Sequence, residues 1–108
     1  MAGPHQDDGV LPDDFDEQVL EVVARIPPGT VMSYGDIAEY LGVGGPRQVG
    51  AVMSRSGGAV PWWRVLHADG SPAPGHEDRA LTELRAEGVP LRADGTRADM
   101  RRARWDGR

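Results

Sequence analysis

The sequence contains no cysteine, which excludes disulfide bonds, thiolate metal sites and any cysteine nucleophile. Its three histidines are scattered without metal-ligand spacing, so neither a metal ion nor another cofactor is expected. No apolar run approaches the roughly 18 residues of a membrane span, and residues 1–12 lack the basic and apolar regions of a secretory signal. We therefore expect a soluble cytoplasmic protein without thiol chemistry.

Lysine is also absent, and the 12 basic residues are all arginine. They are outnumbered by 17 Asp and Glu, which gives a formal net charge of −5, although proteins that bind DNA usually carry an excess of basic side chains. Seven of the acidic residues lie in residues 1–32 with a single arginine, whereas residues 33–65 carry two acidic residues and three arginines. The acidity is thus concentrated near the N-terminus, and the net charge does not exclude a nucleic-acid partner.

Length and composition predict one compact domain, because 108 residues with 39% hydrophobic content leave no room for a second core of similar size. Residues 1–12 are polar, with Gly, Pro and paired Asp, and are expected to form a disordered acidic leader. The folded domain is expected over residues 13–92. Residues 93–108 form an arginine-rich tail, in which Trp105 is a candidate docking residue.

An amphipathic helix is predicted over residues 14–26, with Asp14 as the candidate N-cap and Glu17 three residues later. The Pro-Pro-Gly sequence at residues 27–29 is expected to end it, because proline cannot continue the hydrogen-bond ladder. The apolar face of this helix consists of Phe15, Val19, Val22, Val23 and Ile26.

Two short helices follow across a glycine-containing turn, which predicts a helix–turn–helix. The first is expected to begin with Ser33 as N-cap and Asp36 in the first turn, and the Gly-Val-Gly-Gly sequence at residues 42–45 ends it. Pro46 suits the first position of the second helix, which is predicted over residues 47–55.

The outward face of this second helix carries few large side chains. Glycine in the centre of an exposed helix costs roughly 1 kcal/mol relative to alanine, so Gly50 suggests close approach to another molecule. The minor groove, about 6 Å wide in B-DNA, requires such small residues, whereas packing of Gly50 and Ala51 against another helix is the alternative. Helical spacing places Arg47, Gly50, Ala51 and Ser54 outward, opposite Val49, Val52 and Met53.

The C-terminal half is predicted to contain one helix and two extended segments, so the fold class is mostly α with a small β element. Asp69-Gly70 marks a turn, and Gly88 marks the end of the helix. The predicted elements are an extended segment over residues 60–67, a loop over residues 71–75, a helix over residues 77–87 and a strand over residues 89–92.

Residues 61–65, Pro-Trp-Trp-Arg-Val, resemble the active-site motif Pro-Cys-His-Arg-Val of the O6-alkylguanine-DNA alkyltransferases, whose cysteine accepts the alkyl group. Trp62 stands at the position of that cysteine. Residues 26–38 and 47–53 resemble the DNA-binding segment of the same family, in the same order, and the resemblance extends over about residues 15–91. Because tryptophan replaces the cysteine, the chain resembles the non-enzymatic, alkyltransferase-like branch of the family.

The resemblance implies a winged helix–turn–helix that enters the minor groove, rotates an O6-alkylguanine out of duplex DNA and holds it in a pocket. Since nothing in that pocket accepts the alkyl group, the protein is expected not to be an enzyme. It is expected to act as a monomer that flags the lesion for nucleotide excision repair, and the proteins of that pathway are its implied partners.

Two DNA-binding roles are transferred residue by residue. Arg47 matches the arginine that fills the gap left by the flipped nucleotide, and a phosphate contact at the helix start is the alternative. Tyr34 matches the tyrosine that crowds the phosphate beside the target, and a partly buried structural tyrosine is the alternative. The set implied for DNA binding and base flipping is Ser33, Tyr34, Arg47, Gln48, Gly50 and Ala51.

Trp62 matches the residue that faces the flipped base, where stacking on an aromatic ring is worth roughly 1 to 3 kcal/mol, and a core aromatic is the alternative. Trp63 departs from the family, whose histidine at this position takes part in activating the thiol, and a core position is favoured for it. Arg64 is expected to hold the motif in place through hydrogen bonds. The implied lesion pocket comprises Tyr34, Pro61, Trp62, Trp63, Arg64 and Ser71.

The loop over residues 71–75 is expected to form a wall of that pocket. It carries no large or basic side chain, which suggests that the pocket admits bulky alkyl groups.

Two other classes of function stay open. A true alkyltransferase would need another nucleophile, and no arrangement of Ser, His and Asp suggests one. A helix–turn–helix transcriptional regulator that binds an undamaged operator would present polar residues along its second helix, where Gln48 and Ser54 are the candidates besides two arginines. Such a regulator would also need a dimerisation segment, which the sequence does not suggest.

Overall fold

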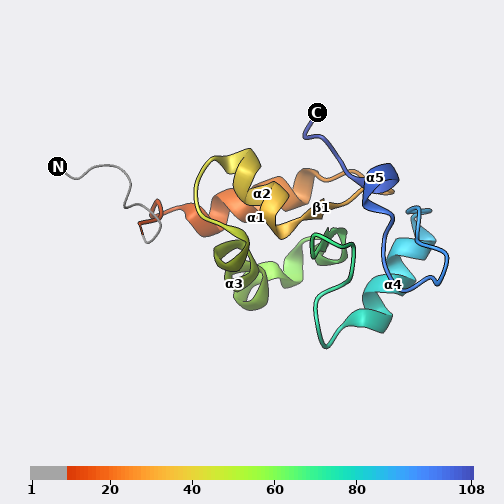
Figure 1. Ribbon diagram of the computed structural model, residues 1–108. Helices are drawn as coiled ribbons and strands as arrows, with labels where there is room; N and C mark the ends of the chain where they lie inside the picture. Colours follow the sequence, from red (N-terminus) through yellow and green to blue (C-terminus); the bar gives the residue numbers. More distant parts are fainter. Residues whose placement is uncertain (1–9) are drawn as a thin grey trace.

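The computed structural model describes residues 10–108, and residues 1–9 of the expected leader lie outside the described residues. The chain forms a mostly helical domain with one small sheet, as the sequence predicted (Figure 1). No helix in this part of the chain is long and apolar enough to cross a membrane. The α-helices are α1 (Phe15–Arg25), α2 (Tyr34–Leu41), α3 (Pro46–Ser56), α4 (Glu77–Ala86) and α5 (Met100–Ala103), the strands are β1 (Met32–Ser33) and β2 (Val65–Leu66), and the 3-10 helices are η2 (Gly57–Ala59) and η3 (Trp62–Arg64).

Helix α1 is present as predicted, and Asp14 occupies its N-cap position but does not cap it through its side chain. Asp14 has φ −100° and ψ 23°, which is not the extended geometry of a capping residue, and it makes no side-chain cap bond. Its Oδ1 instead accepts a hydrogen bond from Nε2 of Gln18 at 2.9 Å. The apolar face packs into the core, where Phe15, Val19, Val22 and Val23 are buried.

Helices α2 and α3 form the predicted helix–turn–helix. At the start of α2, the Ser33 hydroxyl accepts a hydrogen bond from the Asp36 N–H, and the Asp36 carboxylate accepts one from the Ser33 N–H, both at 2.9 Å. This reciprocal cap satisfies two backbone donors and defines where the helix begins. Gly42, whose φ is 77°, ends α2, and Pro46 opens α3.

The sheet consists of β1 and β2 in parallel, with Met32 opposite Val65 and Ser33 opposite Leu66. Parallel strands cannot be joined by a tight hairpin, so α2 and α3 lie in the crossover between the two strands. The residues that follow the two strands consequently lie close to the end of the same sheet.

The hydrophobic core consists of two clusters that meet at this sheet. Met32 and Val65 belong to the first cluster, with helices α1, α2 and α3, whereas Val31 and Leu66 belong to the second, with α4, α5 and the segment between them. Neighbouring residues of a strand point to opposite faces, which explains how so short a sheet serves both clusters. The sheet therefore joins the helix–turn–helix to the C-terminal half.

The two predicted extended segments are found only in part. Residues 60–67 contain a 3-10 turn, because the Arg64 N–H donates to the Pro61 carbonyl at 3.0 Å, and only Val65–Leu66 is a strand. Residues 89–92 form no strand. Their backbone bonds to the segment before α5 instead of to a neighbouring strand, for example from the Arg92 N–H to the Arg97 carbonyl at 2.9 Å.

The C-terminal segment packs along the domain. Helix α5 contributes to the second cluster, and the partly buried Trp105 packs against the first. The Trp105 N–H donates to the Val31 carbonyl at 2.8 Å, and Arg104 pairs with Asp36 at 2.9 Å. The segment is thereby attached to the backbone before β1 and to the cap of α2.

Candidate functional site

A cavity of about 770 Å³ lies between the helix–turn–helix and the beginning of α4. This volume is in the range of pockets that hold small molecules or cofactors. Its walls come from the start of α2, one face of α3, the 3-10 turns and the loop before α4. The lining residues are Tyr34, Pro46, Arg47, Gly50, Met53, Ser54, Gly57, Gly58, Trp62, His67, Ala73, Pro74, His76 and Arg79.

The α3 wall of the cavity has little side-chain bulk. Gly50 lies within this wall, and a Cβ added there would meet only the Tyr34 ring, at an ordinary contact distance of 3.9 Å. Arg47 and Ala51 are exposed, whereas Val49 and Val52 are fully buried. The small residues therefore face outward, as the helical spacing predicted. No other helix of residues 10–108 comes within 4 Å of the position of that Cβ, apart from the Tyr34 ring at the start of α2.

Trp62 forms part of the opposite wall and is partly buried. Its ring centroid lies 5.7 Å from that of His76 and 5.3 Å from the guanidinium carbon of Arg79. The ring of Trp63 meets it edge-on, with centroids 5.6 Å apart. Trp62 thus presents an aromatic surface to the cavity, on which a flat ring can stack.

Tyr34 begins α2 directly after β1, and His67 directly follows β2. The two rings lie 5.3 Å apart, tilted by 49°, so the parallel pairing of the strands brings these side chains together in one wall. Burial raises the pKa of Tyr34 above its ordinary value. The hydroxyl, like that of an ordinary tyrosine, is protonated at neutral pH and can donate a hydrogen bond to an oxygen acceptor, and the shift only extends this state to higher pH.

Trp63 and Arg64 contact Glu87, which directly follows α4, and do not line the cavity. Arg64 donates from Nη2 and Nε to the Glu87 carboxylate at 2.6 and 3.0 Å, and Trp63 donates from Nε1 to its Oε2 at 2.9 Å. Arg64 also donates from Nη1 to the Ile26 carbonyl at 2.9 Å. This Glu87 cluster therefore joins the motif at residues 61–65 to the ends of α1 and α4.

The Glu87 cluster is mostly shielded from water, with 12% of the Arg64 side chain and 13% of the Glu87 side chain exposed. Burial opposes ionisation of the carboxyl group. The hydrogen bonds from Arg64, Trp63 and the Gly29 N–H outweigh that effect and hold the pKa of Glu87 below its ordinary value. The carboxylate is therefore charged at neutral pH and paired with a charged guanidinium.

The implied lesion pocket is brought together only in part. Tyr34 and Trp62 line the cavity, and Pro61, Trp63, Arg64 and Ser71 do not. Ser71 is engaged locally, because its hydroxyl and its N–H both donate to Oδ1 of Asp69, at 2.6 and 2.9 Å.

The implied DNA-binding residues are also divided. Arg47 and Gly50 line the cavity, and Ala51 is exposed on the same helix. Ser33, in contrast, is 4% exposed and uses its hydroxyl in the cap of α2. Its observed contacts are those of a residue that positions Tyr34.

Several lining residues were not anticipated from the sequence. Met53 was expected to face the core, yet it also reaches the cavity. His67, His76 and Arg79 lie outside every motif that the sequence offered, and only their places near β2 and at the start of α4 could have pointed to them. Among residues 10–108, no three His, Asp or Glu side chains are placed to hold a metal ion.

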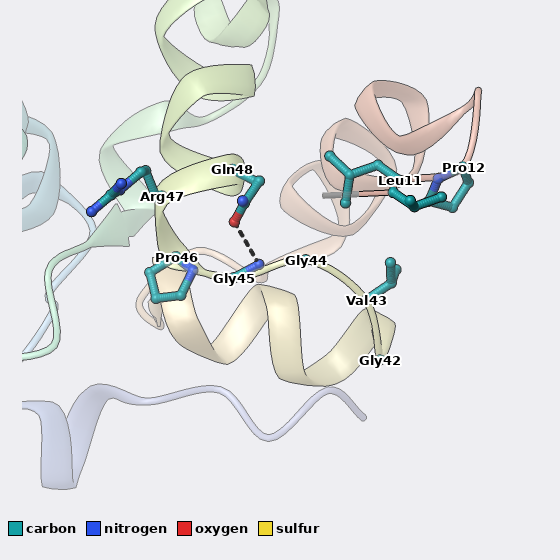
Figure 2. A pocket seen from close by; sticks show the side chains of 10 residues that line it. Leu11, Pro12, Gly42, Val43, Gly44, Gly45, Pro46, Arg47 and Gln48 are labelled. Atoms are coloured by element: carbon teal, nitrogen blue, oxygen red, sulfur yellow. Dashed lines mark hydrogen bonds between the residues drawn. The ribbon is translucent and has the colours of Figure 1, made fainter. Parts of the chain in front are cut away.

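A second hollow, of about 800 Å³, lies between the α2–α3 turn and the segment before α1 (Figure 2). Gln48 is engaged here, because its Oε1 accepts a hydrogen bond from the Gly45 N–H at 2.9 Å. Figure 2 shows the Arg47 side chain pointing away from Leu11 and Val43. The residues that line the second hollow include no aromatic ring and no charged group other than Arg47, so the cavity beside Trp62 is the candidate site.

The chain resembles known proteins over most of its length. The family model for the DNA-binding domain of 6-O-methylguanine DNA methyltransferase matches residues 14–89. A DNA base-flipping protein of Escherichia coli (strain K12) is 38% identical over 99 residues, which cover 87% of this chain and 76% of that protein. Alkyltransferase-like protein 1 of Schizosaccharomyces pombe is 36% identical over 86 residues, which cover 73% and 80%.

Solved structures agree with the sequence comparison. The S. pombe Atl1 structure, in complex with damaged DNA containing O6-carboxymethylguanine, matches with a TM-score of 0.74 and 30% identity, covering 88% of this chain and 97% of that chain. The O6-methylguanine methyltransferase of Mycobacterium tuberculosis matches with a TM-score of 0.60 and 28% identity, covering 78% and 55%.

Proposed function

Because the chain belongs to the 6-O-methylguanine DNA methyltransferase family, and within it to the alkyltransferase-like proteins, we propose that it binds O6-alkylguanine in duplex DNA without removing the alkyl group. The damaged base is flipped out of the helix and held in the cavity beside Trp62. One observation carries the proposal: Trp62 lines the same cavity as Tyr34, Arg47 and Gly50. We align Trp62 with the alkyl-accepting cysteine of the family motif.

Helix α3 is the element that approaches the DNA. Apart from Arg47 and Arg55, its exposed residues are Pro46, Ala51 and Ser54, and such small side chains suit the confined minor groove better than long ones. Arg47 is exposed at the first turn of this helix, next to the cavity, and enters the base stack where the nucleotide has left it. The Tyr34 hydroxyl donates to the phosphate beside the flipped nucleotide.

Two effects favour the damaged base over guanine. Alkylation at O6 removes the N1 proton and weakens pairing with cytosine, so flipping costs less than the few kcal/mol that an undamaged base requires. Each CH₂ of the adduct that is buried against Trp62 then contributes roughly 0.8 kcal/mol. Discrimination therefore increases with the size of the alkyl group as long as the cavity accommodates it.

No alkyl transfer follows from this binding. The indole of Trp62 is not a nucleophile that displaces an alkyl group, and the chain has no cysteine. Trp63, in place of the family's histidine, has only an N–H donor, which it gives to Glu87, so it cannot accept a proton. The lesion consequently persists in the complex, and its removal falls to another system, for which nucleotide excision repair is our proposal.

The loop before α4 suggests that bulky adducts are accepted. Of residues 71–75, Ala73 and Pro74 line the cavity wall, and neither side chain extends far. We expect tighter binding to duplexes with O6-benzylguanine than to duplexes with O6-methylguanine. Equal or weaker binding of the benzyl adduct would show that this wall limits the size of the alkyl group.

The test is an equilibrium titration of matched duplexes that carry guanine or O6-methylguanine, each with 2-aminopurine beside the target base. Fluorescence anisotropy measures affinity, and the rise in 2-aminopurine emission on unstacking measures flipping. The proposal predicts tighter binding and brighter emission for the methylated duplex. If both duplexes bind alike without emission change, the chain is a binder of undamaged DNA, and a search for an operator sequence replaces the proposal.

A further inference from the structure

We propose that Arg79 makes the cavity selective for O6 adducts that carry a negative charge, such as a carboxylate. The inference rests on the proposed function and names the chemical class of lesion that this chain prefers.

The cavity wall is cationic although the whole chain carries a formal net charge of −5. Arg47 and Arg79 contribute permanent positive charges to it. No Asp or Glu of the described residues lines this cavity. A ligand with a carboxylate would therefore meet only groups that are neutral or attractive to it.

Arg79 is the cation placed over the aromatic surface. Its guanidinium carbon lies 5.3 Å from the centroid of the Trp62 ring, so it borders the space in which a stacked base would place its O6 substituent. It has no ion-pair partner within residues 10–108, so its five N–H donors are available. A guanidinium binds a carboxylate through two parallel hydrogen bonds, which a neutral adduct cannot match.

The two arginines of the cavity have separate roles. The proposed function places the Arg47 side chain in the base stack of bound DNA. Arg79, in the first turn of α4, remains in the cavity wall. Glu77, on the same turn of α4, accepts a hydrogen bond from the Gly75 N–H at 3.0 Å, and neither Glu77 nor Asp78 lines the cavity. Arg79 is therefore the permanent positive charge left in the wall to recognise the adduct.

The experiment compares three duplexes, which carry O6-methylguanine, O6-carboxymethylguanine and the uncharged isostere O6-carbamoylmethylguanine. We expect the carboxymethyl duplex to bind about fivefold tighter than the carbamoylmethyl duplex, which is the factor that one charge pair at about 4 Å gives in aqueous surroundings. The preference should shrink as salt increases, because this wall is partly open to water.

Arg79→Met removes the charge and keeps an apolar stem to pack on Trp62. The variant should bind the carboxymethyl and carbamoylmethyl duplexes equally. The ratio of these two affinities is the readout, because Arg79 lines the cavity and a general loss of binding cancels in the ratio. Arg85→Met is the matched control, because this arginine lies on the same helix, donates to the Gly95 carbonyl and does not line the cavity. The control should keep the full preference.

Two outcomes would overturn the inference. Equal binding of the charged and uncharged adducts by the unaltered protein would show that the cavity does not select charge. An equal loss of affinity for all three duplexes in Arg79→Met, with a salt slope lower by about one, would instead assign Arg79 to a backbone phosphate. Neither outcome bears on the proposed function, which depends only on the preference for O6-methylguanine over guanine.

Discussion

The two tryptophans of the motif are adjacent in sequence but belong to different parts of the molecule. Trp62 lines the cavity, whereas Trp63 donates its N–H to Glu87. The arginines near the two tryptophans differ in the same way, because one has free donors and the other has its donors engaged. Arg47 has no hydrogen-bonding or ion-pair partner in the described part of the chain, and Arg64 is fully engaged by Glu87 and the Ile26 carbonyl.

This difference separates binding groups from groups that hold the fold. A side chain that is to meet a partner must have donors or surface left over, whereas a buried charge is tolerated only when its hydrogen bonds are satisfied within the protein. Changes in the Glu87 cluster should therefore reduce stability and leave lesion selectivity intact. Changes on the α3 face should reduce binding and leave the fold intact.

The largest effect is expected from Glu87→Ala. The variant leaves the guanidinium of Arg64 buried without its partner, and such a loss typically costs about 3 kcal/mol in the free energy of unfolding. Urea unfolding measures this change, with Glu83→Ala, an exposed residue of α4, as the control. Where the variant is still folded, its ratio of affinities for methylated and unmethylated duplexes should be unchanged. If the folded variant no longer preferred the methylated duplex, the Glu87 cluster would contribute to lesion binding as well as to stability.

Arg47→Ala should have the opposite profile. Its lesion affinity is expected to fall about tenfold, since one stacking side chain is worth roughly 1 to 3 kcal/mol, and the free energy of unfolding should stay the same. The same anisotropy titration and urea unfolding measure both quantities. Arg101→Ala removes an exposed arginine from α5 and is the control for loss of charge alone. If Arg101→Ala lost as much affinity, Arg47 would contribute only its charge and not a stacking contact.

Gly50→Ala should move stability and affinity in opposite directions. The added methyl group meets only the Tyr34 ring at 3.9 Å, so helix propensity should raise the free energy of unfolding by up to about 1 kcal/mol. Lesion affinity should fall about threefold, because the helix can no longer approach the groove as closely. Ala24→Gly, at an exposed position of α1, is the control and should lower stability without changing affinity. Unchanged affinity in Gly50→Ala would mean that α3 does not approach the DNA closely.

The smallest expected effect concerns the acid side of the stability curve. The pKa of Glu87 is lower in the folded protein than in the unfolded chain, so its contribution to stability is fully present above about pH 4.3 and is lost as the pH falls through the folded value. Glu87→Gln has no such contribution. The difference in free energy of unfolding between the unaltered protein and Glu87→Gln should therefore become smaller below about pH 4. A difference that stays constant with pH would contradict the lowered pKa of Glu87.

The helical half of the fold was predictable from the sequence because its signals are local. The apolar spacing of α1, the Ser33–Asp36 cap and the glycines before Pro46 each act within a few residues. The parallel pairing of β1 with β2 was not predictable in this way, since Met32 and Val65 lie far apart in the sequence and each strand has 2 residues.

The candidate site was predictable for the residues that belong to motifs. Tyr34 and Trp62 were found through the resemblance, and both line the cavity. Arg79 and His76 were not found, because their approach to Trp62 depends on how α4 packs against the motif. Hydrogen bonds from Arg64 that hold the motif in place were expected, but their acceptor Glu87 was missed for the same reason, because it contacts the motif and the chain beyond α1 from a distant segment.

The most direct test asks whether the protein or the DNA is chemically changed when the two bind. The protein is incubated with an excess of O6-methylguanine duplex at concentrations where the complex forms, and intact-mass spectrometry is applied to the protein and to the recovered DNA. The account predicts that both return with unchanged mass and that the recovered duplex still carries the lesion. A protein that has gained the mass of the alkyl group, or a duplex restored to guanine, would contradict it.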